Sequence, residues 1–421
     1  MLKKVVSMLT AIGVVFAMAA CSEKLEAGKS CPLLCPEQAI TLLDTIIDAA
    51  VSDTTVTGLP SIGNEGYLML ASHGDTVETR AIVRYDTLPQ SYTKSGLDST
   101  IVNIDSAYLI TPIAKPDSLR RPKVPLTIEA YDIDTTATDT VASILAPLFR
   151  PDRLIGSKTF APESLLDTLR IPVSTDTILD RVKNGTPLRV GLRIVSTQGV
   201  DLRVGSTAVG LGVTLHIRAS KDTAAQPVNV SPVSHTPKDQ PFLSGPLADY
   251  TIVLNGTTQT GPTFLAVGGV PSRRSFIRFN VPSHIVDSTT VVRASLLLTQ
   301  SPNRRLDLHD SVYVYPLAVL AGPAITDVAS LLQFVGSAGQ FGLDSVRLAP
   351  ADSGVVSFEI VGLVRTWRGQ STTISPRSVA LRSAVEGQAP GEIDFFSTRA
   401  PASVRPRLRI TYVPQISYGL P

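Results

Sequence analysis

The chain has 421 residues, and its 38 basic and 36 acidic side chains leave a formal net charge of only +2. A charge this close to zero, with no basic run, gives no field that would argue for nucleic-acid binding. The 31 prolines and 29 glycines, with many valine, threonine and isoleucine residues, predict an all-β protein rich in turns.

The first 20 residues have the pattern of an export signal. A short basic start precedes an apolar run over residues 5–18, which is too short to span a membrane comfortably. Small residues stand directly before Cys21, and this ending resembles the lipobox of bacterial lipoproteins, in which the cysteine is diacylated after cleavage. The resemblance implies a lipid on Cys21, and Ser22 after it favours the outer membrane. An ordinary secreted protein is the alternative.

Two further cysteines, Cys31 and Cys35, lie close together after the signal. In an oxidising envelope compartment this proximity predicts a local disulfide. A metal or redox site has less support, because no other cysteine or histidine lies nearby and the two-residue spacing of redox pairs is absent. Residues 37–50 show a helical hydrophobic period, whereas their threonine and isoleucine content favours a strand. We take the helix as the expectation.

One stretch of the chain occurs twice. Residues 78–89 and 272–282 each carry an arginine, an aromatic residue and an acid or amide in succession, with a proline shortly after. Later segments match at a spacing of about 190 residues, so we expect two similar domains. The expected organisation is 1–20 signal peptide, 21–50 lipid-anchored tether and lead-in segment, 51–218 first module, 219–246 Pro-rich linker, 247–414 second module and 415–421 tail.

Short apolar runs alternate with turn residues throughout the first module, which indicates a β-sandwich of the jelly-roll type. The expected strands are 66–71, 81–85, 106–110, 126–131, 167–173, 188–195 and 212–217. Short helices at the open ends of the sandwiches are expected over 138–145, 175–185, 326–332 and 360–369. The polar stretch 90–103, which is longer than its counterpart, is expected to be a surface loop.

Alternation along the repeated strand places Arg84 in the first copy and Arg278 in the second on the face opposite the aromatic residue that follows. An arginine that recurs in so apolar a strand predicts a buried structural ion pair. An anion or sugar-acid site is the alternative. Asp201 and Asp394, which correspond between the two copies, are candidate partners.

The order of these features resembles the bacterial DNRLRE-type modules. The second copy carries the pattern more fully, with Trp367 before Gly369 and a closing strand over 406–412. The first copy departs from it, since Asp180 or Arg181 stands where the tryptophan would fall and 213–217 lacks the proline and tyrosine. Such modules are jelly rolls on secreted and envelope proteins, and some bind acidic polysaccharides. We expect Trp367 to lie in the core rather than to serve as a stacking platform.

The sequence contains no Gly-x-Ser-x-Gly elbow and no His-Glu-x-x-His helix, so the hydrolases that carry these motifs find no support. We expect no catalytic residue, metal or cofactor. The expected function is that of a non-catalytic cell-envelope lipoprotein, attached to the membrane by its N-terminal lipid, whose modules bind or scaffold polysaccharide or another surface component. The alternatives are a glycan-active hydrolase or lyase and a purely structural envelope protein.

Overall fold

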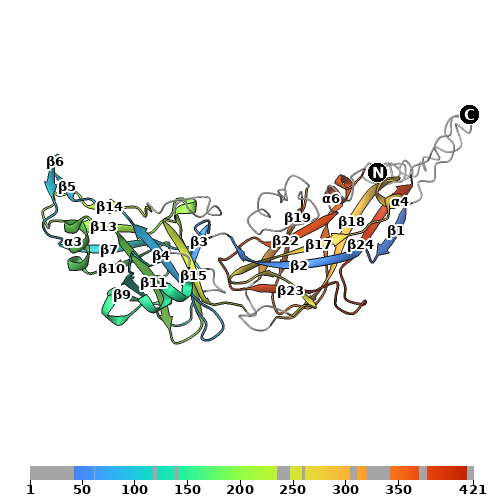
Figure 1. The fold of residues 1–421 in the computed structure, drawn as a ribbon, viewed down its shortest axis with the longest axis horizontal. Coiled ribbons are helices and arrows are strands. Elements are labelled where there is room, and N and C mark those ends of the chain that lie inside the picture. The colour runs from blue at the N-terminus through green and yellow to red at the C-terminus, as the bar shows by residue number, and fades with distance from the viewer. Residues whose placement is uncertain are drawn as a thin grey trace, which may run out of the picture. The chain divides into compact units, whose positions relative to one another are not determined.

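The structure is a computed structural model, and it shows a mostly β chain whose strands form several sheets (Figure 1). It describes residues 42–60, 62–116, 121–137, 141–234, 247–257, 261–303, 311–319, 342–368 and 377–414. Cys21, Cys31 and Cys35, and the helix expected over 326–332, lie outside the described residues.

Two sheets enclose the hydrophobic core of the first half. Val83 and Leu192 from the seven-stranded sheet meet Leu109 and Leu215 from the four-stranded sheet in one buried cluster. The larger sheet contains β3 (Tyr67–Ser72), β4 (Glu78–Tyr85), β8 (Leu126–Asp132), β9 (Leu154–Phe160), β11 (Leu188–Ser196), β12 (Val200–Gly205) and β15 (Asp249–Asn255). The smaller contains β7 (Ser106–Pro112), β10 (Thr168–Pro172), β13 (Thr214–Arg218) and β14 (Val228–Val230). The strands expected in this half are therefore present.

The stretch expected as a loop over 90–103 contains a β-hairpin of β5 (Ser91–Lys94) and β6 (Leu97–Thr100). Its two turn residues, Ser95 and Gly96, both have positive φ angles, of 50° and 82°. A two-residue turn of this kind matches the natural twist of paired strands, which is why the polar segment forms a hairpin.

An eleven-stranded sheet forms the second half and holds a separate hydrophobic cluster. Trp367 belongs to that cluster, with 3 % of its surface exposed, so its expected place in the core is confirmed. The strands are β1 (Leu43–Ile47), β2 (Ala50–Leu59), β16 (Phe264–Gly268), β17 (Ser272–Phe279), β18 (Thr289–Ser301), β19 (Val312–Ala318), β20 (Val346–Leu348), β21 (Gly354–Glu359), β22 (Ser378–Ser383), β23 (Glu392–Phe396) and β24 (Arg407–Pro414).

The helices are short. In α3 (Thr175–Asn184) the Ser174 hydroxyl accepts a hydrogen bond from the Thr177 amide, and Gly185 ends the helix in the left-handed conformation, as its sequence predicts. The other helices of the described residues are α2 (Ala142–Leu145), α4 (Ser283–Val286) and α6 (Val361–Thr366), with single 3₁₀ turns at Ala146–Leu148, Pro151–Arg153, Pro162–Ser164 and Thr207–Val209.

The helix expected over 37–50 is wrong in its described part. Residues 43–47 form β1, which pairs with β24. Asp44 accepts hydrogen bonds from the Arg409 guanidinium, at 2.6 Å from Nη2, and from the Thr411 hydroxyl, at 3.0 Å. Cross-strand partners and the strand preference of threonine and isoleucine therefore outweigh the helical period.

Two strands lie in the opposite half from the one that the duplication predicts. Strand β2, which falls within the expected first module, pairs with β17, and β15, which falls within the expected second module, pairs with β4 (Figure 1). Part of the expected linker is also paired, because β14 lies beside β13 and Val233 bridges to Tyr85. The repeat boundaries seen in the sequence thus differ from the way the strands assemble.

Candidate functional site

Arg84 lies on β4 with 8 % of its surface exposed. Its Nε and Nη2 atoms donate to the two carboxylate oxygens of Asp86, at 3.1 and 2.8 Å. Asp86 follows two positions later, so both side chains leave the same face of the chain. The partners expected from the repeat, Asp201 and Asp394, do not have this role: Asp201 instead lies 3.4 Å from the His73 ring.

The corresponding Arg278 is only half-buried, and the contacts of the described residues include no ion pair to it. Its sequence explains the difference, because Asn280 stands where Asp86 stands in the first copy and carries no charge. The buried ion pairs of β17 involve two arginines that precede Arg278 on the strand. Arg273 pairs with Glu392, and Arg274 pairs with Glu386 through two bonds of 2.5 and 2.7 Å.

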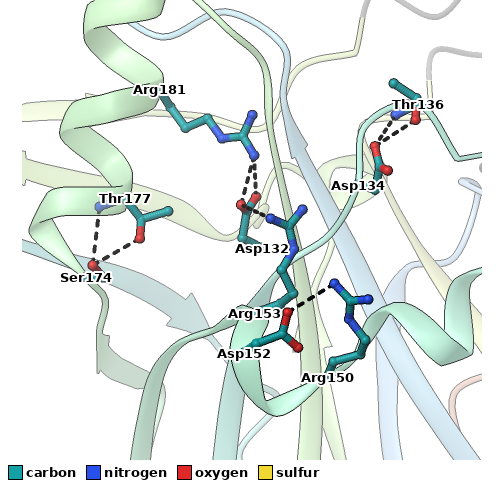
Figure 2. A network of polar contacts seen from close by, with 9 residues as sticks. All are labelled: Asp132, Asp134, Thr136, Arg150, Asp152, Arg153, Ser174, Thr177 and Arg181. Carbon is teal, nitrogen blue, oxygen red and sulfur yellow. Dashed lines mark hydrogen bonds and ion pairs between the residues drawn. The ribbon is translucent and has the colours of Figure 1, made fainter.

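A second polar cluster of the first half joins the end of β8 to α3 (Figure 2). Arg181 donates to Asp132 at 2.8 Å, and Arg153 approaches the same carboxylate at 3.6 Å. In the second half Ala318 lies opposite Val379 as Asp132 lies opposite Val190, and Trp367 packs in the core, so apolar packing occupies the corresponding region. Because the charges compensate one another, we interpret this cluster as structural, linking β8 to α3.

The second half also contains a cavity of about 380 Å³ that is open to solvent. Unlike the ion pairs above, it is lined by acidic, basic, hydroxyl and aromatic side chains together. Its walls come from β2, from the segment leading into β16 and from the turn after β23. They consist of Asp53, Thr54, Thr55, Gly261, Pro262, Phe264, Leu265 and Arg399.

Hydrogen bonds to the turn after β23 fix the Asp53 side chain and the Arg399 backbone. Asp53 accepts the Thr398 amide at 2.5 Å through Oδ2. Arg399 is exposed, and the described contacts include none to its guanidinium, although its backbone amide donates to the Ser397 hydroxyl at 3.1 Å. The cavity therefore presents a cation on a fixed backbone.

The aromatic wall is also fixed. The Phe264 and Phe396 rings lie 5.2 Å apart on the paired strands β16 and β23. The Ser397 hydroxyl donates to the Pro262 carbonyl at 3.0 Å, which ties the loop before β16 to the end of β23. Thr54 and the partly accessible Phe264 also line the cavity.

The first half has a related turn with other side chains. Ser206 and Thr207 correspond to Ser397 and Thr398, but the next residue is Ala208 where the cavity has Arg399. Glu65, which stands near the position of Pro262, is buried here. Its carboxylate accepts the Gly63 amide at 2.6 Å and the Thr251 amide at 3.3 Å.

Burial raises the pKa of Glu65 to about 7, and the nearby Asp249 carboxylate adds to this rise against the hydrogen bonds that lower it. Burial likewise raises the pKa of Asp249, which accepts from the Thr207 amide and hydroxyl at 2.8 and 2.7 Å. Two carboxyl groups thus share a buried region of the first half.

The repeated arginines drew attention in the sequence, whereas the cavity residues did not. Asp53 and Arg399 lie far apart along the chain, and only the pairing of β2 with β17 brings them together. Within the described ranges, no group of three or more histidine, cysteine or acidic residues is arranged to hold a metal ion. The helices of the described ranges are all too short or too polar to cross a bilayer.

No family model matches the sequence, and neither does any curated protein. The solved structure of the Macrobrachium rosenbergii nodavirus aligns with 89 % of this chain and 89 % of its own at 10 % identity, with a TM-score of 0.17. That of infectious bursal disease virus Gt strain aligns with 91 % of this chain and 78 % of its own at 10 % identity, with a TM-score of 0.14. Similarity at this level carries no argument about fold or function.

Replacing Arg84 with methionine should lower the free energy of unfolding by about 3 to 5 kcal/mol, because it leaves the buried Asp86 charge without its guanidinium partner. The matched control is Arg278→Met, which removes the corresponding half-buried arginine and should cost much less. Urea denaturation of both variants measures the difference. Equal losses at the two positions would contradict the assignment of Asp86 as the partner.

The Glu65 carboxyl should make stability depend on pH. Because the pKa of Glu65 rises from 4.5 to about 7 on folding, its contribution to the free energy of unfolding should be greatest below pH 4.5 and be lost as the pH rises through 7. The loss attributable to this group is on the order of 3 kcal/mol. In Glu65→Gln this part of the slope should disappear, whereas the exposed control Glu163→Gln should keep it. Denaturation curves from pH 4 to 8 with an unchanged slope in Glu65→Gln would refute the effect.

Proposed function

We propose that this chain is a non-catalytic cell-envelope lipoprotein that binds polysaccharide through the cavity formed by Asp53, Phe264 and Arg399. The observation that carries the proposal is that the exposed Arg399, whose backbone amide is bonded to Ser397, lines a cavity of small-molecule size together with Asp53 and Phe264. Jelly-roll-type modules and an N-terminal lipid anchor complete the proposal, supported by the repeat and by the residues before Cys21.

The wall chemistry favours a sugar over a wholly apolar ligand. Arg399 supplies up to five hydrogen-bond donors, while the Asp53 carboxylate and the Thr54 hydroxyl supply acceptors. The face of Phe264 offers an apolar surface for the C–H side of a sugar ring. With aromatic residues making up only 5 % of the chain, recognition depends on this combination rather than on a broad aromatic platform.

The duplication does not supply two equal sites, because Ala208 replaces Arg399 in the first half. Binding at the second half alone is therefore the simplest form of the proposal. The runner-up functions are glycan cleavage by a hydrolase or lyase and a purely structural role in the envelope.

We expect residues 22–421 to bind one or more polysaccharides in a glycan screen without producing new reducing or unsaturated ends. Arg399→Ala should weaken binding about tenfold or more, because a charge-assisted hydrogen bond contributes roughly 1.5 to 3 kcal/mol. Arg150→Ala, which removes another exposed arginine far along the chain, is the control. Equal affinity of the two variants would eliminate this cavity as the site, cleavage products would favour the enzyme, and no binding at all would leave the structural role.

The lipid anchor is tested separately. Cells grown with labelled fatty acid should incorporate label into the wild-type chain, because Cys21 is the residue that the lipobox pattern presents for acylation. Cys21→Ser should abolish labelling and release the chain from the membrane fraction, whereas Cys31→Ser should change neither. Labelling that persists in Cys21→Ser would contradict the assignment.

A further inference from the structure

Strands β2 and β15 carry the same short pattern and occupy equivalent places. Asp53 and Thr55 in β2 have the same spacing as Asp249 and Thr251 in β15. Asp53 lies opposite Ile277 on β17, and Asp249 lies opposite Val83 on β4. Ile277 and Val83 are themselves matching residues of β17 and β4, the two copies of the repeated arginine-containing strand, which we call the arginine strands. The two pairings therefore have the same register.

The aspartates of the two strands make the same hydrogen bond. Asp53 accepts from the amide of Thr398 at 2.5 Å, and Asp249 accepts from the amide of Thr207 at 2.8 Å. In both cases the donor follows a serine in the turn after a strand, where a carboxylate satisfies a backbone N–H that the sheet leaves free. This agreement makes a chance contact an inadequate explanation.

The threonines repeat the agreement. The Thr55 hydroxyl accepts the amide of Ala266 on β16 at 3.3 Å, and the Thr251 hydroxyl accepts the amide of Met69 on β3 at 3.0 Å. Each donor strand is therefore fixed to a neighbouring strand of the recipient half as well as to the arginine strand.

The two copies of the repeat exchange strands, because each contributes one strand to the sheet of the other. By position in the repeat, β2 belongs with β4 and β15 belongs with β17, yet each pairs with the other copy's arginine strand. The pairing of β2 with β17 covers eight opposed residues and that of β15 with β4 covers six, which makes both ladders long for edge additions.

We propose that β4 and β17 are strand-acceptor edges, each specific for a strand with the Asp-x-Thr pattern, and that their occupants are β15 and β2 of the same chain. Main-chain hydrogen bonds supply the affinity and the aspartate and threonine contacts set the register, as in other additions of a strand to a sheet edge. A chain cut between the two donors therefore remains one complex, because each piece holds a strand of the other's sheet.

The test uses the full chain with a site-specific protease sequence inserted between Ser234 and Leu247. After cutting, the two pieces should elute together from gel filtration at the size of the uncut protein and separate only in denaturant. The double variant Asp53→Ala, Asp249→Ala should release them at a lower denaturant concentration. Pieces that separate under native conditions would overturn the proposal.

A disulfide identifies which strands hold the pieces together. Ser52 lies opposite Arg278, and opposed residues of antiparallel strands are close enough for a disulfide. In a background with Cys21, Cys31 and Cys35 replaced by serine, Ser52→Cys with Arg278→Cys should covalently rejoin the cut pieces on oxidation. Each single-cysteine variant is the control and should not rejoin them.

Oxidation of the uncut double-cysteine chain decides between occupants, because after cutting one N-terminal and one C-terminal piece would give the same mass from either source. A disulfide-linked product with the mass of one chain supports exchange within the chain. A product containing two copies would assign the donor to a second molecule and overturn the proposal as stated. Co-eluting pieces that do not become linked would also overturn it, because another surface would then be holding them.

Discussion

The structure depends on one constraint, which is that the backbone donors and acceptors along both sides of the two arginine strands, β4 and β17, need hydrogen-bond partners. A strand carries a backbone donor and acceptor at each residue, and a buried strand needs partners for both of its sides. Strand β11 lies beside β4 and β22 lies beside β17. Strands β3 and β16 pair with β4 and β17 only near the start of each strand, whereas β15 and β2 pair with them along most of their length. Completion by the opposite copy joins the halves and also places Asp53 against the turn that carries Arg399, so the candidate cavity is a consequence of the exchange.

The duplicated halves keep their backbone pairing while their charges have diverged. Asp86 gives Arg84 a partner, whereas Asn280 leaves Arg278 without that carboxylate. In the first half the partly exposed Arg181 pairs with the buried Asp132, whereas Trp367 lies in the core of the second half. Hydrogen bonds between backbones tolerate such changes because they do not depend on side-chain type, provided that each buried charge keeps a compensating partner. The halves thus share a pattern of strand pairing but differ in their charged side chains.

Features set by neighbours in sequence were predictable. Alternation placed Val83 in the core and Arg84 on the opposite face of β4, and the capping residues around 175–185 defined α3. Features set by partners distant in sequence were not. The sequence of β2 identifies a strand but contains no information on which copy of the arginine strand pairs with it. The turn at Arg399 was not predicted as part of a site for the same reason, because the other residues of its cavity are distant in sequence. The pairing of Arg84 with Asp86 was predictable, because a residue two positions along a strand lies on the same face.

The central claim is that the two copies complete each other's sheets, and backbone proton contacts test it most directly. In a sample labelled selectively at aspartate, isoleucine and valine, the account predicts nuclear Overhauser contacts between the backbone protons of Asp53 and those of Ile277. It predicts the corresponding contacts between Asp249 and Val83. Contacts of Asp53 with Val83 and of Asp249 with Ile277 would show that each copy folds on itself and would contradict the account.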